Sequence, residues 1–281
     1  MTNAATAEAR PTDSRASDRR RLAGFAVAWA AALVSVGAAV VRAPGAGDAK
    51  LYWDAFHGPL YAGGFVYPPP AALLFTPAIV LSWPAFAVLF LGALAAAGLW
   101  LLWPLPVHLR IPLWIALAAT FAWGNAATLF AVPLALAPRW PALWAGVVWA
   151  KVSPAVGAIS LVRRRRWRDL SFAVGASALV GIATLVLAPG ALADWLAQLG
   201  RFAFVSSWWI PGLLPWTPPF ALRIAVAALV AWFGSSRPWT LALAAVIVTP
   251  DLSLATCGLI AAVPRLMQYG VATIAVPPGS Q

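Results

Sequence analysis

"LAGFAVAWAAALVSVGAAVV", residues 22–41, decides the class of fold to which this chain belongs. An apolar run of about 20 residues in helical form is long enough to cross the ~30 Å hydrocarbon core of a bilayer. Three arginines precede it, as in a signal peptide, but the apolar region of a signal peptide is shorter. We therefore expect a retained first transmembrane helix, preceded by a disordered tail over residues 1–21.

The whole chain has the composition of an integral membrane protein. Of its 281 residues, 62% are hydrophobic and 10% are charged, and the mean hydropathy is +0.83. Soluble domains carry about 25% charged residues. Cys257 is the only cysteine, so neither an internal disulfide nor a cysteine metal cluster is possible. We expect no metal and no cofactor.

Further apolar segments follow along the chain. Residues 85–103 and 170–188 are long enough to span a bilayer, whereas segments such as 71–82 and 126–137 contain 12 residues each. A helix of that length measures ~18 Å, which favours re-entrant, broken or buried helices. The predicted fold class is all-α, a polytopic transmembrane helical bundle of about 8–10 segments. The predicted organisation is a single bundle over 22–266, with outer loops 43–70 and 189–219 and a short C-terminal tail over 267–281.

The arginines predict how the bundle is oriented. The net charge is +11, and arginines cluster before residue 22 and in the block "RRRRWR", residues 163–168. The positive-inside rule places both clusters in the cytoplasm, where they contact anionic membrane lipids; we expect no nucleic-acid partner. If the N-terminus is cytoplasmic, counting the membrane crossings along the chain places four of the eight acids on the extracytoplasmic side: Asp48, Asp54, Asp194 and Asp251. We expect a multi-pass cell membrane protein whose acid–base chemistry is extracytoplasmic.

The polar stretch "GDAKLYWDAFHGPLYAGGFVYPPP", residues 47–70, interrupts the apolar segments. Its first part contains no helix breaker, and in a helix the spacing i, i+4 pairs Asp48 with Tyr52 and Lys50 with Asp54. The prolines that follow Tyr67 are tolerated in a first helical turn and predict the start of the next helix. The simplest interpretation makes Lys50 and Asp54 a solvated pair and the tyrosines interfacial aromatics, while a functional interpretation places Asp48, Tyr52 and Tyr67 at the mouth of a site.

Two polar residues are predicted to lie deep in the bundle. Lys151 follows Trp140 by about 16 Å of helix, near the bilayer midplane, where a charged group is functional by default. Asn125 lies between two short segments, about 21 Å of helix beyond Arg110, and Gly124 permits a break there. The two side chains either line one interior cavity or only cap the ends of broken helices.

Four stretches, in this order, resemble glycosyltransferase family 87, which contains polyprenyl-phosphate-mannose-dependent mannosyltransferases. They are "GDAKLYWDAF" (47–56), "FVYPPPAALLFTPAIVL" (65–81), "GNAATLF" (124–130) and "RWPALWAGVVWAKVSPAVGAISLVRRRRWRDL" (139–170). The resemblance extends from about residue 22 to 266, although the chain is short for the family. The stretch "SSWWIPGLLP" (206–215) matches the serine-rich motif of the family's large outer loop only in part.

The resemblance implies a GT-C fold with its active site at the extracytoplasmic mouth and an essential aspartate in the first outer loop. Asp48 matches that aspartate, and Asn125 and Lys151 match recurrent positions that line the donor cavity. The implied reaction transfers a hexose, mannose in the known relatives, from a polyprenyl-phosphate sugar to an envelope lipid or glycan acceptor.

Such a reaction needs a base for the acceptor hydroxyl and positive charge for the leaving phosphate. In an inverting single displacement Asp48 is the expected general base. The negative charge of the leaving phosphate is expected to be stabilised by Lys50, Arg201 or Lys151. Two other classes of function remain open: a multi-pass transporter, because broken helices and an intramembrane lysine also describe substrate pathways, and a non-catalytic accessory subunit of envelope biogenesis.

Overall fold

The computed structural model describes residues 12–42, 47–61, 65–151, 153–202, 220–249 and 255–274, and these residues are helical with no β-strand among them. The first half contains α1 (Thr12–Arg42), α2 (Gly47–Asp54), α3 (Pro69–Ala72), the 3-10 helix η1 (Leu73–Ile79), α4 (Trp83–Leu102), α5 (Val107–Ile115), α6 (Ala118–Trp123) and α7 (Ala127–Leu136). The second half contains η2 (Pro141–Leu143), α8 (Trp144–Ala150), η3 (Ser153–Ala158), α9 (Ile159–Arg163), α10 (Trp167–Leu187), α11 (Pro189–Phe202), α12 (Phe220–Phe233), α13 (Thr240–Ile247), η4 (Thr256–Ala262) and α14 (Val263–Ile274).

Within the described part of the chain, three helices are long and apolar enough to cross a membrane: residues 18–40 of α1, α4 and α10. On α10 only Ala173 is buried, while large apolar side chains such as Leu179, Leu185 and Leu187 are exposed. An apolar face of this size is rare on soluble monomers. The structure therefore indicates membrane association, as the composition does.

Two of the predicted short segments are broken helices, whereas residues 126–137 form one continuous, largely buried helix, α7. Residues 111–123 divide between α5 and α6, and residues 71–82 divide between α3 and η1. Pro69 and Pro70 begin α3, as predicted, because a proline in the first turn removes only an N–H that has no helical partner.

The structure differs from the sequence prediction at three boundaries. Helix α1 begins at Thr12, so residues 12–21 of the predicted disordered tail are helical; alanine and arginine favour extension of a helix that is already nucleated. Helix α14 extends to Ile274, into the predicted C-terminal tail. Helix α8 ends at Ala150, and Lys151 has an extended backbone with φ −156° and ψ 109°, so Lys151 ends a short helix instead of lying within a long one.

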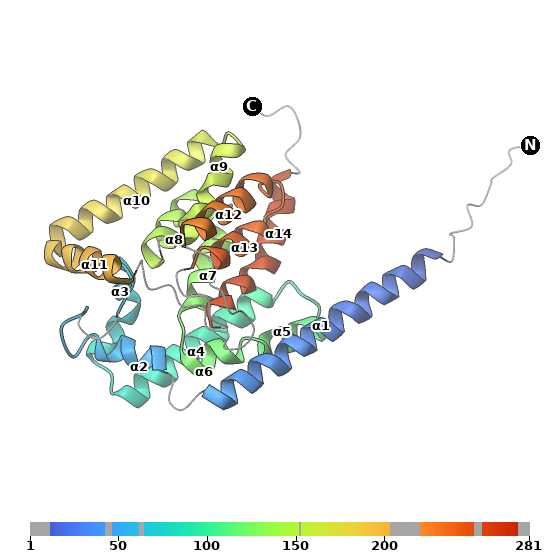
Figure 1. Ribbon diagram of the computed structural model, residues 1–281, viewed down its shortest axis with the longest axis horizontal. Coiled ribbons are helices and arrows are strands. Elements are labelled where there is room, and N and C mark those ends of the chain that lie inside the picture. The colour runs from blue at the N-terminus through green and yellow to red at the C-terminus, as the bar shows by residue number, and fades with distance from the viewer. Residues whose placement is uncertain are drawn as a thin grey trace, which may run out of the picture.

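Helix α7 is the centre of the packing, with α4, α8, α14 and η4 around it (Figure 1). Small side chains permit this close packing: an added Cβ on Gly258 of η4 would lie 2.8 Å from the Thr128 Oγ1 of α7. Helix α1 packs against α5 and α6 and then runs away from the bundle. Its Ser35 accepts a hydrogen bond of 2.9 Å from the Ala119 N–H, which satisfies one of the unpaired donors at the start of α6.

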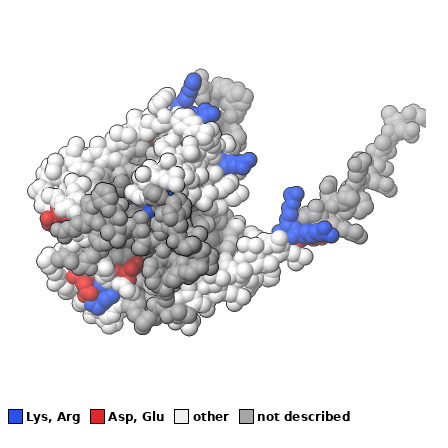
Figure 2. Space-filling view, in the orientation of Figure 1, with Lys and Arg blue, Asp and Glu red and all other residues white. Residues whose placement is uncertain are grey.

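Charge is divided between two ends of the molecule. In Figure 1, α2 and α6 lie at one end and the turn between α9 and α10 lies at the other. Figure 2 shows most basic side chains along the upper edge, where α9 lies, and on the projecting part of α1, whereas most acidic side chains appear at the left and lower left, where a basic side chain lies beside them. The acid-bearing α2 and the arginine block are therefore far apart, as the sequence predicted.

Candidate functional site

Helix α2 carries Asp48 in its first turn, where the exposed N–H groups and the helix dipole favour a negative charge. The helix covers Gly47–Asp54, which confirms the helix predicted for the start of the polar stretch. Asp48 is half-buried, and Ala49 beside it is fully buried against the bundle. The packing of Ala49 therefore determines where the Asp48 carboxylate lies.

Gly124 is the surface on which Ala49 packs. Its φ of +64° is in the left-handed region, where it ends α6 with backbone hydrogen bonds to Phe121 and Thr120. A Cβ on Gly124 would lie 2.5 Å from the Cβ of Ala49 and 3.0 Å from its backbone nitrogen. Both the backbone conformation and the close approach of α2 therefore require glycine here.

Asn125 joins α2 to α7 through its side-chain amide. Its Nδ2 donates to the Asp48 Oδ2 at 2.6 Å, and its Oδ1 accepts from the Ala127 N–H at 2.9 Å. Asn125 is 6% exposed, so its amide nitrogen and oxygen make these two hydrogen bonds in a region with little water. Asn125 therefore caps the start of α7, as one of its two interpretations predicts, and it also positions the Asp48 carboxylate.

Tyr52 follows Asp48 by about one turn of α2, and its hydroxyl oxygen lies 3.0 Å from that of Tyr67. Their rings pack in an aromatic cluster with Phe65, Phe75 and Phe130, and they are 2% and 6% exposed. Burial raises the pKa of Tyr52 well above its ordinary value, and the neighbouring Tyr67 and Asp48 raise it further. Tyr52 therefore stays protonated and cannot serve as a base near neutral pH.

The position of the two tyrosines differs from the prediction that they lie at an open mouth or among headgroups. The physical reason is that five aromatic rings from α2, the 65–67 segment, η1 and α7 bury more apolar surface together than apart. Tyr52 and Tyr67 therefore belong to the packed core against which α2 lies and do not line an open mouth.

Lys50 and Asp54 form the predicted i, i+4 ion pair, and both side chains are partly exposed. The Lys50 ammonium also lies 4.7 Å from the centre of the Trp53 ring. Lys50 is two positions after Asp48, so the two side chains leave α2 on different faces. The structure therefore does not bring Lys50 to the Asp48 carboxylate, and an exposed pair of this kind contributes little to stability.

Helix α11 lies at the same end as α2. Its Trp195 Nε1 donates to the Val66 carbonyl at 3.2 Å, and Tyr61 donates to the Tyr67 carbonyl at 3.2 Å. Burial raises the pKa of Tyr61, and the Asp194 carboxylate of α11 raises it further. Asp194 is thus near the predicted outer loop, while Asp251 and the side chain of Arg201 lie outside the described residues.

An apolar groove of about 420 Å³ lies between α3, α7, α8 and α10. It runs between Pro70, three residues after Tyr67, and Ala150, which precedes Lys151. Its lining is apolar apart from the Trp149 indole nitrogen, and this nitrogen donates to the Ser177 carbonyl at 2.9 Å. A groove of this chemistry suits a hydrocarbon chain.

The sequence predicted short apolar helices, but it did not predict which residues line the groove. The available signal was the pair of small residues Gly146 and Ala150 at spacing i, i+4 on α8, which leaves one face of that helix hollow. Among the described residues no group of three or more histidine, cysteine, aspartate or glutamate side chains lies close enough to hold a metal ion.

Replacing Asn125 by aspartate is expected to destabilise the protein by about 1–3 kcal/mol at pH 7.5, because it sets a second carboxylate against Asp48. The Ala127 N–H keeps its acceptor. Repulsion raises the folded-state pKa of one carboxyl above its unfolded value, so stability returns as the pH falls and that carboxyl gains a proton. The measurement is the difference in Tm between variant and native protein from pH 8 to pH 5. A difference that does not narrow would show that Asp48 and Asn125 are not in contact.

Comparison with models of known protein families, with curated proteins and with solved structures finds no match to this chain.

Proposed function

We propose that this protein is a membrane glycosyltransferase that transfers a hexose from a polyprenyl-phosphate sugar to a hydroxyl group of an envelope lipid or glycan. The observation that supports the proposal most directly is the Asp48 carboxylate, which receives a hydrogen bond of 2.6 Å from the buried Asn125 amide. The motif resemblance named Asp48 and Asn125 as site residues although they are 77 positions apart in the chain. Their contact is therefore an independent argument for a common role.

In the proposed reaction Asp48 acts as the general base. The acceptor oxygen forms a bond to the anomeric carbon while its proton passes to the Asp48 carboxylate, and the bond from the anomeric carbon to the phosphate oxygen breaks. Polyprenyl phosphate leaves with the bonding electrons, and the configuration at the anomeric carbon inverts. The Asn125 amide holds the carboxylate in place, and such preorganisation lowers the barrier.

The leaving phosphate needs positive charge and no acid. Lys50 leaves α2 on a different face from Asp48, so Lys151, which directly follows the groove residue Ala150, is the stronger candidate among the described residues. Ala150 is the last groove residue of α8. A donor whose prenyl tail occupies the groove would therefore carry its phosphate past the end of α8, toward Lys151.

The proposed site faces the extracytoplasmic side of the cell membrane. This orientation is supported by the segregation of α2 from the arginine block, because lysine and arginine are enriched in cytoplasmic segments. The proposed bundle includes the short helices as buried or re-entrant segments beside the three long ones. No metal or cofactor is part of the proposal.

The experiment is a transfer assay with purified protein in proteoliposomes. With polyprenyl-phosphate [¹⁴C]mannose and a lipid extract as acceptor, we expect radioactive glycolipid to appear with time. Empty vesicles and heat-treated protein are the controls. Counterflow of labelled sugar without a new glycosidic bond would support a transporter instead, and the absence of both signals with several sugar donors would support an accessory subunit.

A further inference from the structure

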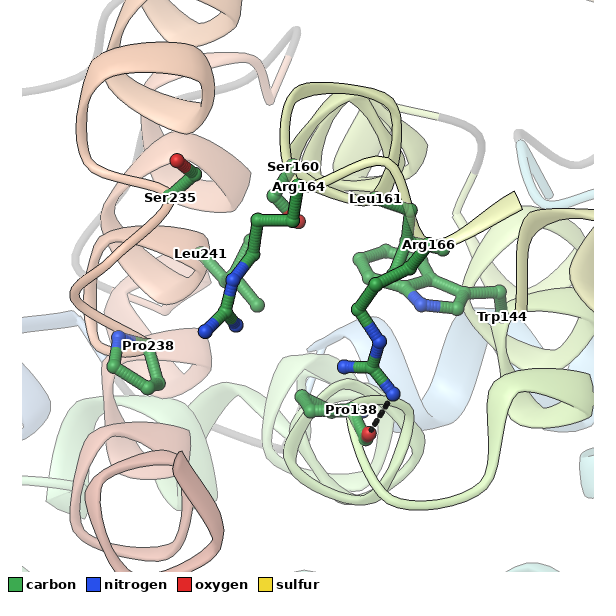
Figure 3. A pocket seen from close by; sticks show the side chains of 9 residues that line it. All are labelled: Pro138, Trp144, Ser160, Leu161, Arg164, Arg166, Ser235, Pro238 and Leu241. Carbon is green, nitrogen blue, oxygen red and sulfur yellow. Dashed lines mark hydrogen bonds between the residues drawn. The ribbon is translucent and has the colours of Figure 1, made fainter. Parts of the chain in front are cut away.

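The apolar groove between α3, α7, α8 and α10 has a volume of about 420 Å³, which is in the range of ligand pockets. A smaller cleft lies beside the turn between α9 and α10 (Figure 3), but it has room for about 20 Å³, enough for one water molecule. There Arg166 donates to the Pro138 carbonyl at 3.4 Å, which helps to close the cleft. Of these two hollows, the groove is the one that can hold part of a lipid chain.

The groove walls α7 and α8 are consecutive helices that run in opposite directions. Pro138, which follows α7, and Trp144, which begins α8, line the small cleft together, so the end of one helix lies beside the start of the other. Farther along, an added Cβ on Gly146 of α8 would lie 3.3 Å from the Pro133 Cβ of α7. The two helices therefore meet closely at this level, which is one end of the groove lining.

The other end of the groove lies at the candidate site. Because both helices rise about 1.5 Å per residue, Leu129 and Ala150, each four residues from that close contact, are level with each other and about 6 Å farther along. Lys151 follows Ala150, and Asn125, which binds the Asp48 carboxylate, lies about one turn before Leu129. Lys151 and the Asp48 carboxylate are thus at the same end of the groove.

The groove opens sideways toward the position of the bilayer. Leu74 of η1 lines it and is 50% exposed, and Leu179, beside the lining residue Val180 of α10, is 69% exposed. Helix α10 is long enough to cross a membrane, and Ala173 is its only buried residue. A chain that leaves the groove on this side therefore passes into lipid and not into water.

Trp149 gives the groove a fixed wall. Its Nε1 donates to the Ser177 carbonyl at 2.9 Å, and an added Cβ on Gly181 would lie 2.9 Å from its Cζ2. The indole is therefore held against α10 by a hydrogen bond and by close packing. A hollow that is already formed binds a chain without first ordering its own side chains, which favours binding.

The length of the groove limits how much of a chain it can contact. Its two ends are about 6 Å apart along α8. A prenyl chain advances by about 5 Å for each five-carbon unit, because each unit contributes four main-chain bonds of about 1.5 Å. With the side chains at both ends included, the groove contacts about two such units. Further units lie in the bilayer, where their surroundings are the same in the free and the bound lipid.

We propose that this groove recognises the two isoprene units next to the phosphate of the sugar donor, and that Trp149, Ala150 and Val180 determine which chains are accepted. The inference rests on the proposed function, because it takes the donor's prenyl chain as the occupant. In the donor a single phosphate separates this chain from the reacting carbon, so the chain must begin beside Asp48, as the groove does. The acyl chains of a glycerolipid acceptor begin several bonds farther from the reacting hydroxyl.

The test compares mannosyl phosphates of five-carbon and ten-carbon prenyl alcohols in the transfer assay. We expect kcat/KM to rise about tenfold or more from five to ten carbons, since each buried carbon contributes about threefold to fourfold. Val180→Phe narrows the groove from α10 and should lower this ratio about threefold to tenfold. Partition of the donors into detergent is the same for both proteins and does not affect the comparison.

Val174→Phe is the matched control. It makes the same change on the same helix, but Val174 is exposed and does not line the groove, so we expect the native ratio and the native Tm. Ala150→Leu fills the groove from the opposite wall and covers the case in which the new phenylalanine turns toward lipid. Native ratios in both groove variants would overturn the proposal. A raised KM for the acceptor lipid with native donor ratios would also overturn it, since the acceptor chain would then occupy the groove.

A binding measurement separates this inference from the proposed function. Geranyl phosphate, which has two isoprene units and no sugar, should raise the thermal unfolding midpoint of the native protein in neutral detergent, and should raise that of Val180→Phe less. If this difference is found but no donor supports transfer, the groove binds prenyl phosphates and the proposed reaction is wrong. If transfer occurs but neither the midpoint nor the donor ratio responds to Val180→Phe, the proposed reaction stands and the role of the groove is overturned.

Discussion

Replacing Asp48 by asparagine is expected to lower the rate of sugar transfer by about 10²–10⁴-fold, the usual contribution of a general base. The asparagine has the same shape, and its carbonyl oxygen can accept from the Asn125 amide as the carboxylate oxygen does. The variant should therefore fold as the native protein does and lose only the ability to take a proton. The measurement is the initial rate of glycolipid formation at equal protein level and equal Tm.

Asp54→Asn is the matched control for Asp48→Asn. It makes the same chemical change on the same helix, at the exposed end of the pair with Lys50. Because exposed ion pairs contribute between about 0 and 1 kcal/mol, we expect native Tm and a transfer rate within about twofold of the native rate. A native rate in Asp48→Asn, or an equal loss in both variants, would contradict the assignment of Asp48 as the base.

Replacing Gly124 by alanine is expected to displace α2 and to abolish most of the activity without touching any reacting atom. The left-handed backbone at φ +64° costs a residue with a Cβ roughly 1–2 kcal/mol. In addition, the new methyl group would lie 2.5 Å from the Ala49 Cβ and 3.0 Å from the Ala49 nitrogen, closer than van der Waals contact. Helix α2 must then move, and the hydrogen bond of Asp48 with Asn125 is lost. A displacement of ~1 Å can cost about 10²-fold in rate.

Two further variants test the cause of this effect. Gly92→Ala lies within α4, where nothing is within 4 Å of the added Cβ, and it should raise stability by up to about 1 kcal/mol. Adding Ala49→Gly to Gly124→Ala removes the 2.5 Å contact but leaves the 3.0 Å approach to the backbone nitrogen of residue 49 and the strained backbone. We expect this double variant to recover part of the rate and part of the Tm. If the second change recovers neither, the close approach of α2 is not what positions Asp48.

The local features of the site could be predicted from the sequence. The helix Gly47–Asp54, the pair of Lys50 with Asp54 and the proline start of α3 all follow from spacing and from backbone chemistry within a few residues. The break at Gly124 was also predictable, because glycine ends helices in the left-handed conformation. Each of these features depends on neighbours along the chain, which the sequence shows directly.

The features that involve distant residues could not be predicted in the same way. The hydrogen bond of Asp48 with Asn125 joins α2 to the start of α7, and the contact of Tyr52 with Tyr67 depends on the packing of five aromatic rings. Lys151 was placed in a long helix because its flanking residues are apolar, but the chain breaks there. Apolar periodicity indicates that a segment is buried and does not reveal where a buried helix is interrupted.

The sequence by itself determined that this chain is helical and apolar enough for a membrane, and it singled out Asp48 as the residue to test. Only the tertiary structure decided that α2 packs closely against Gly124 and that Asn125 holds the carboxylate. The physical reason is the range of the interactions concerned. Helix formation and membrane partition depend on local composition, whereas a site depends on contacts between segments that only the packing of the whole chain brings together.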